Sequence, residues 1–201
     1  MGMNQLYFLR HGETNHNKER RLQGRLDIPL NDTGIQQANA SLELLKPLGI
    51  KRIIHSPLIR CVETAKIVAA ALPSDVILKS DSRLIERDFG SFQNRLAPDL
   101  CKELGIEKLM LFENEHFPPD AETMEQVGTR INACIDDLLG QDIPTLIVAH
   151  AGIFWQLAIE YDCVPEMIPN SQPYQIIPNA KGSWDFVPVG GVFKPADRMA
   201  G

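Results

Sequence analysis

The sequence has few cysteines, and no two of them are closely spaced. Its four cysteines lie far apart in the chain and form no CxxC motif: Cys61, Cys101, Cys134 and Cys163. Zinc sites and redox dithiols both use closely spaced cysteines, so this arrangement argues against either. We expect reduced, partly buried thiols, as in a cytoplasmic protein. His, Asp and Glu form no tight ligand cluster either, and we expect no metal and no other cofactor.

Long apolar runs and an excess of positive charge are also missing. No run approaches the roughly 20 apolar residues that a membrane-spanning helix needs. The first residues lack the basic segment and the apolar length of a signal peptide. The net charge is -6, which disfavours nucleic acid and acidic membranes as partners. We therefore expect a soluble cytoplasmic protein, in which any anion must be bound by a local positive charge.

What is present is a chain of 201 residues, 44% of them hydrophobic, without repeats or an evident linker. This length predicts a single domain over residues 1–201. Short apolar segments predict strands at residues 6–9, 52–55, 76–79 and 145–150, and shorter edge strands at residues 174–177 and 184–187. Apolar residues at helical spacing predict helices between them, on faces that include Ile35, Ala38, Leu42 and Leu45, then Ala65, Val68, Ala69 and Leu72, then Val127, Ile131, Cys134 and Leu138.

This alternation predicts an α/β fold, a three-layer sandwich with a mainly parallel sheet flanked by helices. Residues 90–121 interrupt it with a weak pattern that allows short helices at residues 99–104 and 107–113. We interpret this stretch as a small insertion covering the edge of the sheet that carries the candidate site.

Polar groups stand where three of the predicted strands end. The first strand ends in Arg10 and His11, the second leads to Arg60, and the fourth ends in His150. Because ligands of open α/β sheets bind beyond the carboxyl ends of the strands, we expect these groups to meet at one edge. Gly12, directly after His11, would permit a close backbone approach and unusual dihedral angles.

Converging arginines and histidines indicate phosphoryl chemistry. Two guanidinium groups repel each other unless an anion lies between them, and each fits phosphate oxygens in a bidentate way. A neutral imidazole whose other ring nitrogen donates to a carbonyl can attack phosphorus. A second histidine could stabilise the transition-state charge, and a buried carboxylic acid with a raised pKa could protonate the leaving group.

These residues lie in motifs that resemble the histidine phosphatase superfamily, which includes the phosphoglycerate mutases. "LRHGETNHN" is similar to the family's signature, and further blocks follow in the family's order across most of residues 6–152. They are "QGRLDIPLNDTGIQQA", "SPLIRCVETA", "RLIERDFGSF", "PPDAETMEQVGTR" and "LIVAHAG".

The resemblance implies a role for each matching residue. His11 would be the nucleophile that forms a phosphohistidine, and Glu86 the proton donor that later activates water. His150 would act with Arg10 and Arg60 on the phosphoryl group, and Asn17 would add a polar contact to it. The family needs no metal.

Several alternatives stay open at this stage. Asp88 competes with Glu86 as the acid, and Arg83 and Arg87 could hold Glu86 in a solvated ion pair. Glu122 is a secondary candidate that could equally be a carboxylate in the first turn of a helix. His16 is the other secondary candidate, close enough in sequence to His11 to line the mouth of a pocket.

The chain departs from the family pattern where substrate preference is set. Phe92-Gln93-Asn94 replaces the usual Trp-Glu-Gly, Ala121-Glu122-Thr123 replaces Gly-Glu-Ser, and Ala149 and Ala151 flank the second histidine. None of these changes removes a catalytic group, but they prevent the transfer of a substrate from any particular relative.

We therefore expect a phosphatase that hydrolyses a small phosphomonoester, with a small phosphorylated metabolite as its partner. The first alternative is a cofactor-dependent phosphoglycerate mutase; the segment from Glu86 to His150 and the tail after His150 are shorter than the family's mutases would have. The second is a phosphate-binding regulatory module without catalysis. The substrate and the oligomeric state are not readable, although edge strands near Tyr174 and Trp184 could pair in a homodimer.

Overall fold

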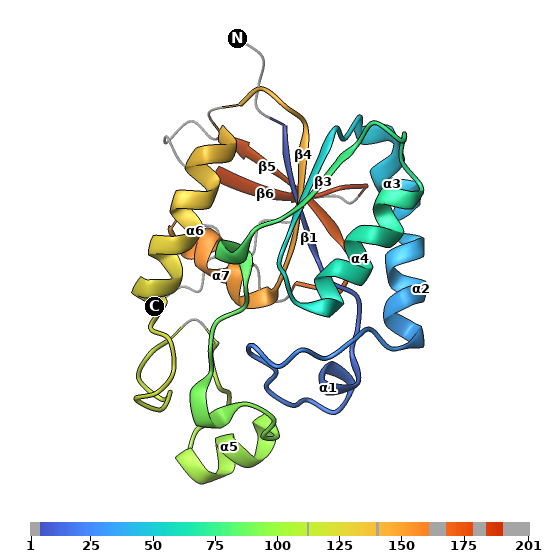
Figure 1. Ribbon diagram of the computed structural model, residues 1–201. Helices are drawn as coiled ribbons and strands as arrows, with labels where there is room; N and C mark the ends of the chain where they lie inside the picture. Colours follow the sequence, from blue (N-terminus) through green and yellow to red (C-terminus); the bar gives the residue numbers. More distant parts are fainter. Residues whose placement is uncertain (1–4, 112, 140, 161–167, 179–183, 191–201) are drawn as a thin grey trace.

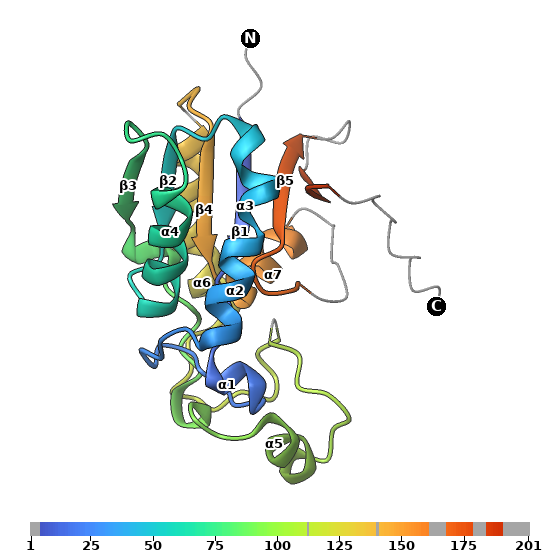
Figure 2. The ribbon, with the colours of Figure 1, turned by 90° about the vertical axis from the view of Figure 1, so that its right-hand side faces the viewer.

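The computed structural model describes residues 5–111, 113–139, 141–160, 168–178 and 184–190. They form a six-stranded sheet in the order β3-β2-β4-β1-β5-β6 (Figure 2). Its strands are β1 (Leu6–Arg10), β2 (Arg52–His55), β3 (Ile77–Ser80), β4 (Thr145–Ala149), β5 (Pro173–Pro178) and β6 (Trp184–Pro188). The first four are parallel, whereas β5 and β6 are antiparallel additions, so the sheet is mainly parallel as predicted.

Helices cover both faces of this sheet (Figure 1). On one face lie α2 (Asp32–Ala40), α3 (Leu42–Leu45) and α4 (Ile59–Ala70), and on the other lie α6 (Met124–Leu139) and α7 (Ala151–Glu160). Each face has its own apolar core, one around Phe8, Ile131 and Phe154 and the other around Leu9, Ile53 and Val68. This is the predicted three-layer sandwich.

The central strands β1, β2 and β4 carry mostly apolar side chains because both of their faces are covered. All of β2 and β4 is buried, and in β1 only Arg10, the last residue, is partly exposed. A parallel sheet covered by helices on both faces favours such continuous runs over an alternating pattern. The order also corrects one prediction: β5 is paired with both β1 and β6, so it is not an edge strand.

The predicted apolar face of the first helix, the one that included Ile35 and Ala38, was wrong at Ile35 in α2. Ile35 is 44% exposed, whereas Gly34 and Ala38 form the buried stripe of α2. Ile35 lies one residue after Gly34 and hence about 100° around the helix from it. Gly34 must face inward because its backbone packs directly against the backbone of Glu13.

The insertion contains one of its two predicted helices. Helix α5 (Ala97–Leu104) covers the first, and Gly105 ends it in a left-handed conformation with a φ of 70°. The second, at residues 107–113, does not form within the described residues. The carbonyl groups of Leu111 and Glu113 instead accept hydrogen bonds from the guanidinium of Arg87, at 2.9 and 2.8 Å. Tertiary contacts thus replace the helical ones.

The insertion lies beyond the carboxyl ends of β1 and β4, together with the short helix α1 (Asn15–Lys18) (Figure 1). It has a small apolar core around Phe89, Leu100 and Leu109. Three short 3-10 helices complete the described structure, at Lys46–Leu48, Ser82–Leu84 and Gly90–Phe92.

The described cysteines carry free thiols, as expected from their spacing. Cys61 and Cys134 are free and buried, Cys101 is free and partly buried, and Cys163 lies outside the described residues. Among the described helices, none combines the length and the apolar character needed to cross a membrane.

Candidate active site

The carboxyl ends of β1 and β4 bring two histidines together. The two strands are parallel neighbours with Arg10 opposite Ala149, and the next residues are His11 and His150. The backbone N–H of His11 donates to the carbonyl of Ala149 at 3.0 Å. Both side chains are buried, and their rings meet edge to face with centroids 5.3 Å apart. Two residues far apart in sequence therefore share one location because the strands pair in this register.

The imidazole of His11 is held in one tautomer. Its Nδ1 lies 2.7 Å from the carbonyl oxygen of Gly12, and because a carbonyl only accepts, Nδ1 must carry the proton. The lone pair is then on Nε2. Burial, followed by the charges of Arg60 and Arg10, lowers the pKa of His11 well below its ordinary value. A neutral imidazole with a free Nε2 is the form that can act as a nucleophile.

Gly12 is required here for close packing and not for its dihedral angles. A Cβ atom at this position would overlap the backbone carbonyl of Gly34, at the start of α2. Gly12 does not have a positive φ, so the unusual dihedral angles that we expected for it are absent. Its N–H donates to the hydroxyl of Thr64 at 3.1 Å. The segment that carries His11 thus packs directly against the backbone of one helix and a side chain of another.

Arg60 points into the same region from the first turn of α4. The side chain is 1% exposed, and two carbonyl groups of the preceding loop orient it: Nη1 donates to Leu26 at 2.7 Å and Nη2 to Gly24 at 2.8 Å. Its Nε is buried without a hydrogen-bond partner. Burial lowers the pKa of Arg60. A cation at the start of a helix also opposes the helix dipole. A bound anion would offset both the cost of burying the charge and this unfavourable interaction with the dipole.

Arg10 is the second cation of the cluster. Its Nη1 donates to the carbonyl of Ile168 at 2.8 Å, and its Nε is also buried without a partner. Burial, together with repulsion by Arg60, lowers the pKa of Arg10 to about 10 even though Glu86 opposes this shift. In the part of the chain that the structure describes, neither arginine forms a salt bridge. Their charges are therefore available to an anion.

Glu86 is a buried carboxyl group that contacts the first turn of α7. The backbone N–H groups of Arg87 and Gly152 donate to its two oxygens, at 2.9 and 3.3 Å. Burial raises the pKa of Glu86, although these two hydrogen bonds and the charge of Arg60 partly offset the effect. A Cβ atom at Gly152 would overlap Glu86 Oε1, so this glycine makes room for the acid.

The alternatives for the acid differ in their surroundings. Asp88 is partly exposed, pairs with Arg25 at 3.7 Å and caps the N–H of Gly90 at 2.9 Å. Its neighbour Glu86 is 6% exposed and, within the described residues, forms no ion pair. The buried Glu86 has the raised pKa expected of a general acid at neutral pH.

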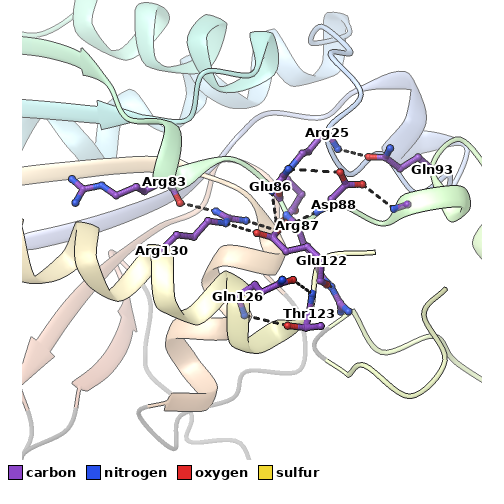
Figure 3. Close-up of polar contacts among 11 residues, drawn as sticks. Arg25, Arg83, Glu86, Arg87, Asp88, Gln93, Glu122, Thr123, Gln126 and Arg130 are labelled. Atoms are coloured by element: carbon purple, nitrogen blue, oxygen red, sulfur yellow. Dashed lines mark hydrogen bonds and ion pairs between the residues drawn. The ribbon is translucent and has the colours of Figure 1, made fainter. Parts of the chain in front are cut away.

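Glu122 does not lie in the first turn of a helix and instead joins an ionic network below Glu86 (Figure 3). Its carboxylate pairs with Arg130 at 2.9 Å and with Arg25 at 3.1 Å. Burial opposes ionisation, but hydrogen bonding to Arg130 and the two positive charges lower the pKa of Glu122. The backbone of residue 88 adds a donor to Glu122 at 3.3 Å. Glu122 therefore supports the segment that carries Glu86.

The remaining two candidates lie at the outer side of the site, in and around α1. Asn17 closes a capping box in which its Oδ1 and the hydroxyl of Thr14 each accept from the other residue's backbone N–H. The box does not use the amide NH₂ of Asn17. His16 is further out: its Nε2 lies 3.0 Å from Oδ1 of Asn94 on an exposed surface.

Several residues of the site could not be recognised from sequence patterns. The segment before β5 supports the nucleophile, because Asn170 Nδ2 donates to the carbonyl of His11 at 2.7 Å and the N–H of Ser171 donates to that of Arg10 at 2.9 Å. On the other side, Ser56 Oγ lies 2.7 Å from Nε2 of His150. All three contacts join residues that are distant in sequence, and no local pattern indicates them.

The arrangement combines a neutral nucleophile, two unpaired cations and a buried acid within one group of strand and helix ends. It can bind a phosphoryl group and transfer it to nitrogen. Within the described residues, no three His, Cys, Asp or Glu side chains are grouped so that they could hold a metal ion.

Comparison with known proteins agrees with this description. The family model of the histidine phosphatase superfamily (branch 1) matches residues 6–170. The Probable phosphoglycerate mutase GpmB of Enterobacter sp. (strain 638) is 41% identical over 152 residues, which are 74% of this chain and 70% of that protein. The protein of the same name from Escherichia coli (strain K12 / DH10B) is 38% identical over the same shares.

Solved structures share the architecture at lower sequence identity. A mycobacterial glucosyl-3-phosphoglycerate phosphatase in complex with VO3 superposes with a TM-score of 0.80 at 24% identity, covering 94% of this chain and 100% of that one. Bacillus stearothermophilus YhfR gives a TM-score of 0.79 at 24% identity, covering 94% and 98%. These similarities concern the fold.

Proposed function

Because the chain belongs to the histidine phosphatase superfamily, we propose that it is a phosphatase that hydrolyses a small phosphomonoester through a phosphohistidine at His11. The observation that carries this proposal is the contact between His11 Nδ1 and the carbonyl of Gly12. It leaves a nucleophilic Nε2 beside two arginines, Arg10 and Arg60, that have no carboxylate partner.

In the first step, the lone pair of His11 Nε2 attacks the phosphorus atom and the ester P–O bond breaks. Arg10 and Arg60 hold the nonbridging oxygens and balance the charge that develops on them. The leaving alkoxide takes the proton of Glu86, whose burial keeps it protonated at a higher pH than an ordinary carboxyl group. The products are an alcohol, a phosphohistidine and an ionised Glu86.

In the second step, water attacks the phosphohistidine. The carboxylate of Glu86 removes a proton from the water, the P–N bond breaks, and the electron pair returns to Nε2 of His11. Inorganic phosphate is released and Glu86 is again protonated. The same acid therefore serves as the base, as microscopic reversibility requires.

A phosphoglycerate mutase is the alternative that the named relatives support, since the two GpmB proteins carry that designation. A mutase would use the same residues but would return the phosphoryl group to substrate and exclude water. The segment between Glu86 and His150 contains one described helix before α6 and no larger added unit, which favours the phosphatase. A phosphate-binding module without catalysis is disfavoured because every proposed catalytic group is present.

The substrate class beyond a small phosphomonoester stays open. Sugar phosphates, phosphoglycerates, nucleotide precursors and phosphoserine-like metabolites all fit the proposed chemistry. A panel of these compounds, assayed in parallel for phosphate release and for mutase activity, distinguishes the two enzyme functions directly.

The test of the mechanism uses p-nitrophenyl phosphate. We expect His11→Ala to lose all turnover, and the wild type to show an acid-labile phosphoryl group on His11 after rapid quenching. His116→Ala is the control, because His116 lies in the insertion and takes no part in the proposed steps. Full activity of His11→Ala would contradict the mechanism, and phosphoryl transfer to phosphoglycerate without phosphate release would favour the mutase.

A further inference from the structure

The second histidine is held by a serine that has no assigned role. Ser56 follows β2 directly, and its Oγ lies 2.7 Å from Nε2 of His150. Both side chains are fully buried, at 0% exposure. The N–H of Ser56 donates to the carbonyl of Val148 at 3.0 Å, which fixes the serine relative to β4. The hydroxyl and the imidazole are therefore held together by the pairing of the two strands.

The surroundings of Ser56 decide which group donates in this hydrogen bond. The Oγ already accepts from the N–H of Leu58, at 3.4 Å. If Nε2 of His150 also donated to it, the hydroxyl proton would be left in a fully buried place with a thiol as its only other neighbour. Leaving a buried donor without a good acceptor costs about 1–3 kcal/mol. The favoured arrangement has the hydroxyl of Ser56 donating to Nε2.

That thiol belongs to Cys61, which is a poor competitor for the proton. Burial raises the pKa of Cys61 to about 12, so it stays a neutral thiol and a weak acceptor. Its Sγ lies 3.5 Å from the carbonyl of Ala149, toward which the S–H is directed. The sulfur is also 3.5 Å from Nε2 and 3.8 Å from Nδ1 of His150, so it packs along the ring without competing strongly for either nitrogen.

A hydroxyl that donates to Nε2 places the proton of the neutral ring on Nδ1. Burial, followed by the charge of Arg60, lowers the pKa of His150 well below its ordinary value, so the ring is neutral at pH 7. A neutral imidazole carries one proton. Apart from the weak sulfur contact, Nδ1 has no hydrogen-bond partner among the described residues. It is a spare donor close to the positive charges of Arg60 and Arg10.

We propose that Ser56 is a positioning residue that holds His150 in the Nδ1–H tautomer and thereby makes the second histidine a hydrogen-bond donor to the phosphoryl oxygens. With Nε2–H instead, Nδ1 would present a lone pair to an anion, and the contact would be repulsive. His11 and His150 thus share one tautomer for opposite purposes. The Nδ1–H of His11 is tied to a carbonyl and its Nε2 attacks, while Nε2 of His150 is tied to a hydroxyl and its Nδ1–H donates.

The first test is ¹⁵N NMR of the wild-type protein with labelled histidine, at neutral pH and without phosphate. Protonated and unprotonated ring nitrogens have widely separated shifts, and the chain has five histidines, so a His150→Asn variant identifies the signals of His150. We expect a proton on Nδ1 and a bare Nε2. A ring protonated on Nε2, or on both nitrogens, would overturn the proposal, and this measurement needs no variant of Ser56.

The second test compares Ser56→Ala with Ser56→Thr, which keeps the hydroxyl. In Ser56→Ala we expect a mixture of His150 tautomers, weaker binding of inorganic phosphate, and a kcat for p-nitrophenyl phosphate lower by about tenfold. This is less than the roughly 10²–10³-fold loss caused by removing an oxyanion donor itself. Ser56→Thr should restore the Nδ1–H signal. A single Nδ1–H tautomer retained in Ser56→Ala would refute the role of the serine.

Ser41→Ala is the matched control, because it also removes a buried hydroxyl, one that donates to the carbonyl of Ala38 at 2.7 Å in the α2–α3 segment. It should leave the His150 spectrum unchanged. The proposal rests on the proposed function only for its catalytic consequence. If the protein hydrolysed none of the tested esters while its tautomers behaved as expected, the function would fail and the positioning role of Ser56 would stand.

Discussion

At the scale of single residues, Glu86 shows how the backbone sets the chemistry of a side chain. Its carboxyl group is buried, yet it accepts only two N–H groups, from Arg87 and Gly152. These donors are too few to offset the loss of water, so the protonated form is favoured. The acid is therefore tuned mainly by burial, and changes that alter its space or its charge should have separate effects on turnover and stability.

Glu86→Gln should affect substrates according to their leaving groups. An alkyl phosphate needs a proton on its leaving oxygen, whereas p-nitrophenolate leaves with little help. We expect about a 10²–10⁴-fold fall in kcat/KM for an alkyl phosphate, the usual contribution of a general acid, and a much smaller fall for p-nitrophenyl phosphate. Steady-state kinetics on both esters tests this. Equal losses on both would show that Glu86 is not the acid in the first step.

The same substitution should stabilise the folded protein at neutral pH. Because the pKa of Glu86 is raised on folding, its ionisation costs stability once the pH exceeds the ordinary pKa of a glutamate. Gln is neutral and avoids this cost, although its single amide oxygen can accept from only one of the two N–H groups, which in the wild type donate to different oxygens. Thermal unfolding should give a higher Tm for Glu86→Gln than for wild type at pH 7, with the difference shrinking toward pH 4.

Gly152→Ala tests the space that Glu86 occupies. The new Cβ atom would overlap Oε1 of Glu86, so the carboxyl group must move away from its two donors. We expect a fall in kcat on alkyl phosphates. In a double-mutant cycle, the alanine should cost much less when Glu86 is already Gln, because residues in contact are not additive. Additive losses would place the effect of the alanine elsewhere.

At the scale of elements, the insertion is fastened to the catalytic segment by one arginine. Arg87 is 1% exposed, and among the described residues its guanidinium donates to neutral acceptors of residues 111–122: the carbonyls of Glu122, Leu111 and Glu113, and Oδ1 of Asn114. Its guanidinium carbon also lies 4.1 Å from the ring centroid of Phe117. The backbone N–H of the same residue holds the carboxyl group of Glu86. The order of the insertion and the position of the acid are therefore linked.

Arg87→Met keeps the length of the side chain but leaves buried carbonyl groups without donors. We expect a loss of about 3 kcal/mol in the free energy of unfolding, and faster limited proteolysis within residues 107–122. Arg95→Met is the matched control, since Arg95 pairs with Glu103 on the surface and its loss should change little. Equal proteolysis of the two variants would contradict the anchoring role of Arg87.

At the scale of the whole molecule, the fold buries two positive charges close together, an arrangement that costs free energy unless an anion binds between them. Arg10 and Arg60 approach each other at the end of a buried sheet, and their Nε groups lack partners. An anion that binds only the folded state stabilises it by mass action, about 2.7 kcal/mol at a concentration 100 times Kd. The mutual repulsion of the two cations is relieved at the same time.

Inorganic phosphate should therefore raise the Tm of the protein by several degrees at saturation. Differential scanning fluorimetry with a phosphate titration, compared with chloride at equal ionic strength, measures this. Arg60→Met should abolish the shift, whereas Arg95→Met should retain it. A shift that persists without Arg60 would mean that phosphate binds somewhere else.

The sequence itself determined the fold class and which residues stand where the strands end. The strands at residues 6–9, 52–55 and 145–150 are apolar and short, so burial on both faces is the only arrangement that hides them. Because parallel strands align their carboxyl ends, their terminal residues Arg10, His11 and His150 had to meet. Local pattern and strand direction are sufficient for these conclusions, and the matching family blocks agree with them.

Only the tertiary structure decided how those groups are protonated and held. The tautomer of His11 depends on a carbonyl one residue away, but that of His150 depends on Ser56, from another strand. The predicted helix at residues 107–113 does not form within the described residues, where the carbonyls of Leu111 and Glu113 accept from the guanidinium of Arg87. Ile35 faces water because Gly34 must touch the backbone of Glu13. For His150 and Ile35 the deciding contact joins residues that are distant in sequence, and such contacts leave no periodic trace in the sequence.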